Sequence, residues 1–540
     1  RNLNRQAFAS MLVNSGKWYA EFVGTASDNA NMIGVGPYQV RLSATENNTR
    51  YAYVYSDGDS YLRTAGSESI STYGGGIPVN NVIGVYLDMD AATPVVYFSS
   101  NGQWADGSGN FDESSPTAGI TLGDSFFTTD TGNWDGYGTF IASSAGGGYN
   151  MTIHANFGQD STFAGLKTAG GNTDANGFGD FAYPVPTGAL SMCSANLPEP
   201  TIKKSSKYFD IKLYTGNGAT SARAISGFNF APDFVWLKNR DSTYHHQLHD
   251  TVRGTSGGVI YSNTNDDEDA TYSLASFNSD GFSIAKDADQ AGQNNNGDDY
   301  VSWCWDAGGS TVTNNDGSVS SQVRASTTAG ISIVTYTGTG SNITVGHGLG
   351  VTPDVHFIKS RSNSGNNWLV NFTLMDGSFD SLRLNGSNQR GNITAYNAPT
   401  STVFSRPSSQ DDNNEEMLAY CFASVKGFSK YGTFRGTANA DGPYIYLGFR
   451  PALVIIKKIN ASGEWVMLDD TRDTGNVTKN FLFASETTVE SAGSGSTENY
   501  IDILANGFKL RNGNNKTNAS GKVMLYMAWA RSPFKYSRAR

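Results

Sequence analysis

The sequence predicts an all-β protein in which an N-terminal β-sandwich is followed by three tandem, jelly-roll-like β-sandwich domains. The first supporting observation is the composition: only 16% of residues are charged, whereas Gly occurs 62 times and 12% of residues are aromatic. This balance is typical of short strands joined by many turns, without the Glu, Lys, Ala and Leu enrichment of helices. The second observation is a strand-like segment that occurs three times. The third is the spacing of its copies, which is close to the length of a small domain.

The repeated segment runs from a proline to a lysine six residues later, at Pro232–Lys238, Pro353–Lys359 and Pro451–Lys457. Most residues between the two are β-branched or aromatic, and such residues favour strands. Because proline cannot donate a hydrogen bond to a sheet, we expect it at the first residue of each strand. Each copy therefore predicts one buried strand that ends in a cation.

Two further motifs keep the same order around this segment. A Tyr-Thr-Gly motif precedes it at 214–216 and 336–338, with a weaker copy at 434–436. An apolar strand follows it at 300–305, 418–422 and 525–529. The repeated lysines are 121 and 98 residues apart, which is too long for the coil of a solenoid and suits tandem domains.

These motifs predict the domain boundaries. The expected order is a β-sandwich at 1–165, a Gly- and Pro-rich linker at 166–206, repeat 1 at 207–309, a linker at 310–327, repeat 2 at 328–425, repeat 3 at 427–534 and a basic tail at 535–540.

Charge and cysteine usage narrow the functional classes. The formal net charge is −11 and no basic cluster stands out, so we expect no nucleic-acid partner. No run approaches the roughly 18 apolar residues of a membrane span, so we expect no membrane insertion. Cys304 and Cys421 occupy the same point of repeats 1 and 2, where repeat 3 has Ala528. We expect them to be free, buried core residues of separate domains.

The first domain carries an ordered set of motifs at Ser15–Phe22, Ile33–Gly36, Val82–Asp90, Val96–Gly102 and Asn156–Gln159. The fourth ends in Asn-Gly, a strong hairpin signal because both residues tolerate positive φ. As an ordered set these motifs resemble a SPRY domain. The resemblance implies a concanavalin-like sandwich of two antiparallel sheets.

The whole order of motifs resembles virion structural proteins of marine tailed bacteriophages. The segments that carry this resemblance are Ser194–Thr201, the Tyr-Thr-Gly and Pro-Asp-x-Val units, and the ending Ala-Trp-Ala-Arg-Ser-Pro-Phe. It implies a non-enzymatic tail fibre or other appendage, located in the virion and assembled in the host cytoplasm. The implied partners are other virion proteins of tail or capsid, and a host-surface glycan or receptor. Alternatives are a capsid-attached head fibre or decoration protein, a surface or secreted lectin-like adhesin, and a glycan depolymerase. We also expect a homo-oligomer, with a trimer as the favoured state.

Candidate site residues are of three kinds, and we expect no catalytic residue, metal or cofactor. His245 and His249 could meet at a metal, but if their segment is a strand they lie about 13 Å apart, so we expect none. The acidic loops Asn263–Asp269, Asp287–Asp299 and Asp411–Glu416 favour solvated turns over calcium sites, because Ala291 stands where a calcium loop needs a ligand. Aromatic residues beside Gly-rich loops of the first domain either bind a glycan or protein surface or cover one face of a strand. They are Tyr51, Tyr53, Tyr55, Tyr61, Tyr73, Trp104 and Trp134.

Overall fold

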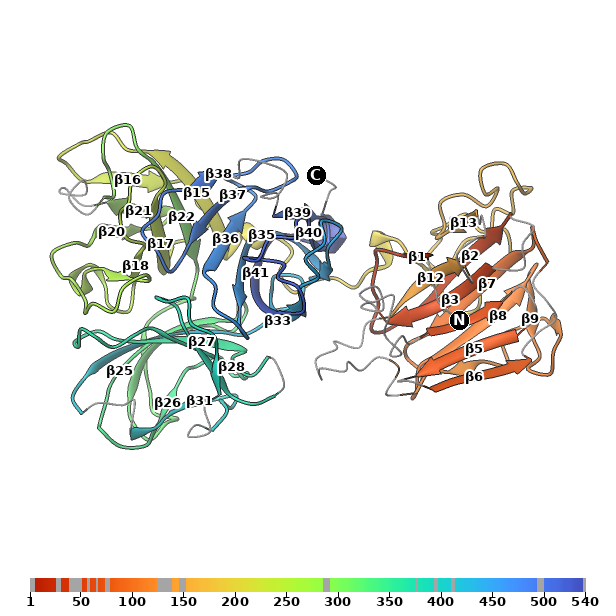
Figure 1. Cartoon of the computed structure of the whole chain (residues 1–540), viewed down its shortest axis with the longest axis horizontal. Helices are drawn as coiled ribbons and strands as arrows, with labels where there is room; N and C mark the ends of the chain where they lie inside the picture. Colours follow the sequence, from red (N-terminus) through yellow and green to blue (C-terminus); the bar gives the residue numbers. More distant parts are fainter. Residues whose placement is uncertain are drawn as a thin grey trace. The chain divides into compact units, whose positions relative to one another are not determined.

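The structure is a computed structural model, and it forms two compact units, residues 1–198 and 199–540 (Figure 1). The residues that it describes are 5–25, 31–37, 51–55, 59–64, 67–72, 78–123, 126, 138–144, 152–284, 292–374, 377–392, 397–408, 413–492 and 500–537. Every described regular element is a strand or a short 3₁₀ turn, which confirms the predicted all-β class. No described helix is long and apolar enough to cross a membrane.

The N-terminal unit is a pair of sheets, as the sequence predicts, and all described strand pairs are antiparallel except that of the two-residue strand at 190–191, which is parallel. One sheet has six strands in the order β1 (Arg5–Phe8), β12 (Gly138–Ser144), β3 (Asn31–Pro37), β4 (Tyr51–Tyr55), β5 (Asp59–Thr64) and β6 (Ser67–Thr72). The other runs β10 (Phe111–Glu113), β9 (Gln103–Ala105), β8 (Val95–Ser100), β7 (Val82–Asp88), β2 (Lys17–Gly24) and β13 (Ile153–Asn156), with β11 (Ile120–Thr121) beside β8 and β14 (Leu190–Ser191) beside β2. Strand β7 is buried along its whole length, so both of its faces are covered.

The second face of this sheet is covered by the segment after β13. Phe181 and Ala189 pack on Tyr19, Tyr86 and Trp104 of the sheet. The buried Glu21 carboxylate on β2 accepts the backbone N–H groups of residues 182 and 183, at 2.8 and 2.9 Å. Most of the stretch predicted as a linker, 166–206, therefore lies within the compact N-terminal unit, which extends to residue 198.

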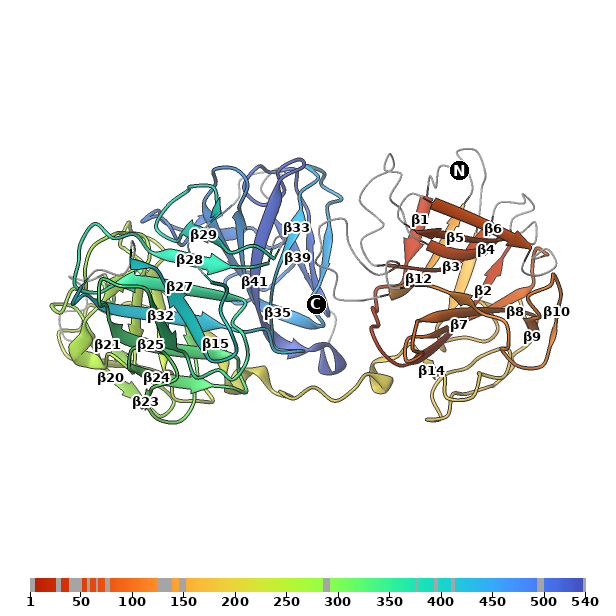
Figure 2. The same ribbon diagram turned by 90° about the horizontal axis from the view of Figure 1, so that it is seen from below.

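The C-terminal unit holds three copies of one arrangement, a larger sheet facing a small one (Figure 2). The larger sheet of repeat 1 is β15 (Phe209–Thr215), β22 (Asp299–Trp305), β17 (Phe234–Asn239), β18 (Gln247–Asp250) and β19 (Ile260–Tyr261). That of repeat 2 is β25 (Ile331–Thr337), β32 (Glu416–Phe422), β27 (Val355–Ser360), β28 (Leu369–Phe372), β29 (Asp380–Arg383) and β30 (Gly391–Asn392). That of repeat 3 is β33 (Ser429–Arg435), β41 (Val523–Pro533), β35 (Phe449–Lys458), β36 (Trp465–Asp469), β37 (Asn480–Phe483) and β38 (Ser491–Ala492).

Each small sheet follows the same order. In repeat 1 it is β16 (Arg223–Ser226), β21 (Gly281–Ile284) and β20 (Leu274–Asn278), and in repeat 3 it is β34 (Tyr444–Tyr446), β40 (Gly507–Leu510) and β39 (Ile501–Leu504). In repeat 2 the described part is β26 (Ile343–Gly346) and β31 (Val403–Arg406).

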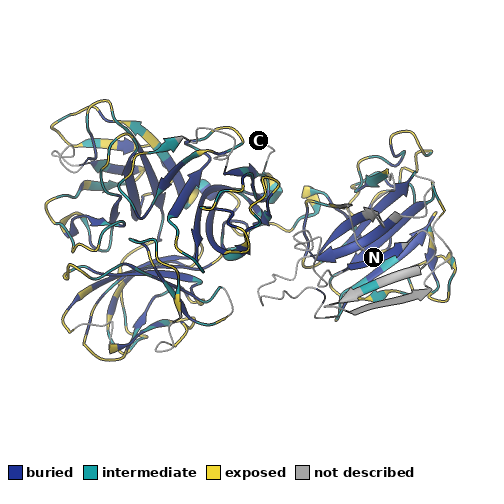
Figure 3. Cartoon of the chain, in the orientation of Figure 1, coloured by how far each residue is buried: buried dark blue, intermediate teal, exposed yellow. Residues whose placement is uncertain are grey.

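The central strands of the larger sheets are buried on both faces (Figure 3). On β17, Phe234 and Trp236 face one apolar core that all three repeats share. Val235, between them, faces the separate core under the small sheet of repeat 1. Cys304 and Cys421 lie in the separate local cores of repeats 1 and 2, and both are buried and free, as predicted. The run of apolar residues without alternation follows from burial on both faces.

Two boundaries differ from the sequence-based expectation. Strands β17 and β27 begin two residues after Pro232 and Pro353, whereas β35 begins at Phe449 and contains Pro451. The pairing of β35 with β41 shifts register around Pro451, and such an irregularity accommodates a residue that cannot donate a ladder hydrogen bond.

The segment predicted as a linker at 310–327 contains the hairpin β23 (Val312–Asn314) and β24 (Ser321–Ser326), which extends the sheet of repeat 2 beside β25. Its turn contains Asp316-Gly317, and an Asp-Gly dipeptide between two strands predicts a hairpin.

We expect Trp236→Ala to lower the free energy of unfolding by about 3 to 5 kcal/mol, because it removes a large ring from the shared core. Since that core joins the three repeats, calorimetry should show the whole C-terminal unit melting earlier in one transition. Loss of repeat 1 alone, with an unchanged transition for repeats 2 and 3, would contradict a shared core.

Candidate functional site

The structure places three of the predicted aromatic site residues in the interior. Tyr51, Tyr53 and Trp104 are 0%, 1% and 5% exposed, so their rings offer no surface to a glycan. The rings of Tyr51 and Tyr53 pack against each other with centroids 4.8 Å apart. Tyr55 and Tyr61 lie on β4 and β5, and their side chains are outside the described part. Tyr73 and Trp134 also lie outside the described residues.

The histidine pair does not converge on one point. The His245 ring contacts the Asn263 amide at 2.8 Å, whereas His249 is buried next to Gln247. Burial lowers the pKa of His249 to about 3, so this imidazole is neutral. Within the described part of the chain, no three His, Cys, Asp or Glu side chains gather as a metal-binding group. Of the acidic loops, residues 285–291 and 409–412 lie outside the described residues.

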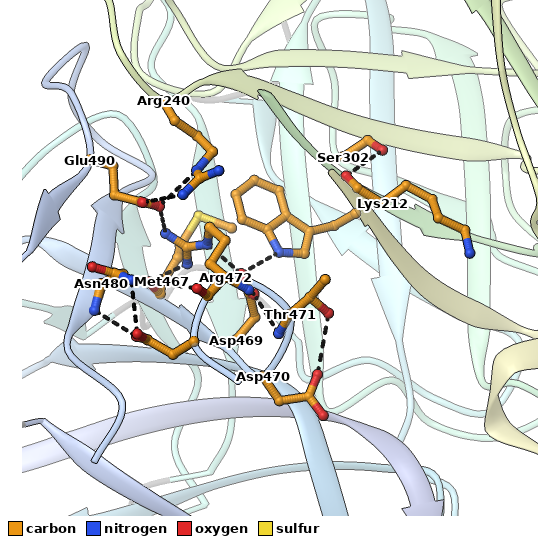
Figure 4. Close-up of polar contacts among 12 residues, drawn as sticks. Lys212, Arg240, Ser302, Met467, Asp469, Asp470, Thr471, Arg472, Asn480 and Glu490 are labelled. Atoms are coloured by element: carbon orange, nitrogen blue, oxygen red, sulfur yellow. Dashed lines mark hydrogen bonds and ion pairs between the residues drawn. The ribbon is translucent and has the colours of Figure 1, made fainter. Parts of the chain in front are cut away.

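A polar cluster joins repeat 3 to repeat 1 (Figure 4). Arg472 donates through Nε to Asp469 at 2.5 Å and through Nη1 to Glu490 at 2.9 Å. Glu490 also receives Arg240 of repeat 1, at 2.6 and 3.1 Å. The Trp303 indole N–H donates to Asp469 at 3.2 Å, and the Arg472 guanidinium lies over the Trp303 ring, 5.5 Å from its centre. Burial by itself would lower the pKa of Arg472, but the two carboxylates outweigh it and raise that pKa.

A second cluster, made of residues at equivalent positions, joins repeat 1 to repeat 2. Arg253 donates to Asp250 at 2.6 Å and to Glu268 at 2.8 Å, and Glu268 also receives Arg361 of repeat 2 at 2.6 Å. Tyr420 takes the place of the tryptophan, and its hydroxyl donates to Asp250 at 2.8 Å. The side chains of Arg253 and Asp250 are fully buried, so neither charge has water as an alternative partner.

At the third junction, between repeats 2 and 3, the cluster is replaced as a whole. The positions equivalent to the tryptophan and the aspartate are Met527 and Phe372, both buried in the shared core. Ile459 holds the position equivalent to Arg240 of repeat 1 and Arg361 of repeat 2. Arg390 holds the position equivalent to Glu268 and Glu490. If only some residues of the cluster were replaced at this junction, a buried charge would be left without a partner. Replacement of the charged residues together avoids this cost.

One backbone hydrogen bond recurs at all three junctions. Residue 268 donates to the carbonyl of 361, residue 390 to that of 459, and residue 490 to that of 240, at 2.8, 2.7 and 2.7 Å. These bonds run from repeat 1 to 2, from 2 to 3 and from 3 back to 1. The three repeats are therefore closed into a ring of equivalent junctions.

The lysine that ends each repeated strand is part of the same junctions. Lys359 donates to the carbonyl of residue 265 at 3.2 Å, Lys457 to that of 387 at 3.1 Å, and Lys238 to that of 487 at 3.4 Å. All three lysines are buried, and burial lowers the pKa of each to about 8. Each accepting carbonyl belongs to the neighbouring repeat, so the cation predicted at the end of the strand ties that strand to another repeat.

The arrangement holds three β-sandwiches at fixed positions around one core. The repeated segments predict the buried lysines, but not the arginines and carboxylates of the junctions. A usable signal exists: Asp-x-x-Arg occurs at 250–253 and again at 469–472, at equivalent places in repeats 1 and 3. In both copies the aspartate caps the backbone N–H groups two and three residues later, while its other oxygen binds the arginine.

The three repeats that form the ring lie within a segment that matches a protein family. The family model described as "Domain of unknown function (DUF7483)" matches residues 204–533. No curated protein matches the sequence. A solved structure similar to part of the chain is the SPRY domain of human HERC1, at 14% identity and a TM-score of 0.19, covering 28% of this chain and 80% of that one.

We expect Asp469→Asn to lower the free energy of unfolding by about 3 to 5 kcal/mol, because it leaves the buried Arg472 with reduced compensation. The matched control is Glu416→Gln, which breaks the pair of Arg361 with a carboxylate that is 61% exposed and should cost less than about 1 kcal/mol. Urea unfolding measures both variants. Equal losses would show that burial of the junction contributes nothing.

The lysine junctions predict a rise of stability with pH. The folded-state pKa of Lys238, Lys359 and Lys457 is about 8, whereas an unfolded lysine titrates near 10.4. Between these values the unfolded chain binds more protons, so the free energy of unfolding rises by up to about 1.4 kcal/mol per pH unit for each lysine. Below pH 8 their contribution is constant. Above about pH 8.5 the thiols of Cys304 and Cys421 oppose part of the rise, because burial raises the pKa of both in the folded state. Above about pH 10 ionisation of unfolded tyrosines adds to this opposition.

Urea unfolding between pH 7 and about 9.5 tests this rise. Lys359→Met should lower the slope, because it removes one of the three lysines whose pKa falls on folding. Lys204→Met, at an exposed lysine, should leave the slope unchanged. A flat profile for the unmodified protein would contradict the depressed lysine pKa values.

Proposed function

The chain belongs to the DUF7483 family, which its residues 204–533 match, and from the resemblance of its motifs we propose that it is a structural protein of a tailed-bacteriophage virion. In this proposal it is a non-enzymatic tail-fibre or other appendage component that makes assembly contacts and binds the host surface. Its partners are other virion proteins and a glycan or receptor of the host.

The observation that carries the proposal is the use of the repeated motifs. The Pro-to-Lys segments resemble those of virion appendage proteins, and in this chain they form the central strands and the lysine contacts of the ring. A motif that serves to lock sandwiches together suits a protein whose task is to hold a rigid shape. A particle appendage has that task, because its contacts must keep their spacing under load.

The ring also bears on how attachment is divided within the chain. The arginines and carboxylates at two junctions form ion pairs with one another and are not available to a host ligand. In this proposal the surface loops of the two units therefore make the host contacts. With several domains on one chain, individually weak contacts gain roughly 10² to 10⁴ in avidity through effective concentration.

Electron microscopy of phage particles with gold-labelled antibody against the C-terminal unit tests the proposal. We expect label on the tail or its appendages, at regular positions. Label on the capsid would favour a head fibre or decoration protein. Purified particles without label, from a lysate that contains the protein, would overturn the proposal.

A further inference from the structure

The first strands of the three larger sheets have different neighbours on their outer edges. In repeat 2, β25 is covered by the antiparallel strand β24, which pairs with it from Ser321↔Tyr336 to Ser326↔Ile331. In repeats 1 and 3, β15 and β33 end their sheets among the described strands. The chain thus shows in repeat 2 what covers this edge, an antiparallel strand.

The edge of β33 is already partly occupied. Ser429 exchanges both backbone hydrogen bonds with Val425, and the Thr433 hydroxyl donates to the carbonyl of Leu374 in repeat 2. Among the described residues, no segment pairs with the outer edge of β15 through its backbone, so β15 offers the more open edge.

The backbone groups of β15 divide into inward and outward sets. The N–H of Gly216 donates to residue 298 at 2.7 Å, and the N–H of 306 donates to Tyr208 at 2.9 Å, so the even-numbered residues of β15 pair with β22. Residues 211, 213 and 215 therefore direct their backbone groups away from the sheet.

Two of these six outward groups are satisfied by the chain itself. The N–H of Ile211 donates to the Asp210 carboxylate at 2.9 Å, and the carbonyl of Thr215 accepts Arg223 at 2.7 Å. The other four are the carbonyl of Ile211, the N–H and carbonyl of Leu213, and the N–H of Thr215.

These four groups are complementary to themselves. If two copies of β15 lie antiparallel with Leu213 opposite Leu213, the two Leu213 residues exchange two hydrogen bonds. The N–H of Thr215 in each copy then meets the carbonyl of Ile211 in the other. This register uses all four open groups. The N–H of Ile211 and the carbonyl of Thr215 face each other in the same pairs and keep their bonds to Asp210 and Arg223.

We propose that β15 is a self-association site, at which a second copy of this chain adds its own β15 to form a continuous sheet across a two-fold axis. The inference is independent of the proposed function. It differs from the trimer expected from the sequence, because the ring already provides a threefold set of repeats within one chain.

The side chains agree with this register. Leu213 is 40% exposed, whereas Thr335 and Thr433 hold the equivalent positions in repeats 2 and 3, so the apolar residue stands on the open edge. An exposed apolar residue on an open edge strand favours pairing with another strand. Lys212 would face Tyr214 of the second copy, so no like charges lie opposite each other.

The open length of the edge is short, because the side chains of Phe209 and Ile211 are buried and the open backbone groups run only from the carbonyl of Ile211 to the N–H of Thr215. Such a small contact belongs to the weak class of interfaces. We therefore expect a dimer that forms reversibly as concentration rises.

Sedimentation equilibrium of the full-length chain over a wide concentration range tests the proposal. The unmodified chain should approach twice its monomer mass at the highest concentrations. Leu213→Lys places two like charges opposite each other and should raise the midpoint concentration of dimer formation by about tenfold or more. Thr433→Lys is the matched control at the equivalent position of β33 and should leave the midpoint unchanged.

A second variant separates the backbone contact from the side chain. Leu213→Pro removes an outward N–H that β22 does not use, and an edge strand tolerates proline at such a position. It should weaken the dimer as Leu213→Lys does, with a near-unchanged melting temperature. A chain that stays monomeric or forms trimers would overturn the proposal. So would a dimer that both Leu213 variants leave intact or that Thr433→Lys weakens equally.

Discussion

The C-terminal unit depends on the requirement that a buried cation find oxygen partners. Each repeated strand carries its lysine into the interior, where water is excluded and an unpaired ammonium group would be costly. The carbonyls that meet Lys359 and Lys457 at 3.2 and 3.1 Å come from the preceding repeat. Lys457 also donates to Gly463, and Lys238 to Asn239 and Ser242, within their own repeats, so the neighbouring repeat completes each set of partners. The lysines therefore add to the contacts that hold the three sandwiches in one unit.

Burial on both faces of the central strands has the same effect on the apolar residues. Trp236 faces the shared core and Val235 faces the local core. A repeat taken alone would therefore expose one apolar face of its central strand. The polar clusters add specificity to this association. Two junctions carry the full set of arginines and carboxylates, and the third carries Met527 and Phe372 in the corresponding places. A repeat placed at the wrong junction would therefore set a charged group against an apolar one, and such mismatches select one order of assembly.

Much of this architecture can be predicted from the sequence, because local patterns encode it. The Pro-to-Lys segments mark the central strands, and the matched positions of Cys304 and Cys421 indicate two local cores, as the structure confirms. The junctions are harder to predict, since Arg240 and Glu490 are 250 positions apart and meet only when repeat 3 returns to repeat 1. The aromatic residues on β4 show a different limit. Alternation of Tyr51 and Tyr53 predicts that they share one face of a strand, but it does not tell whether that face is open or covered.

The way in which the ring closes has a topological consequence. Glu199, where the ring begins, forms an ion pair with Lys535 at 3.1 Å, and the hydroxyl of Tyr536 donates to the same carboxylate. The two ends of the ring therefore meet at one place on its surface. A circular permutant that starts at repeat 2 or repeat 3 would need only a short new link between these ends and would keep every junction. In the natural order, the chain therefore enters and leaves the ring at neighbouring points of its surface.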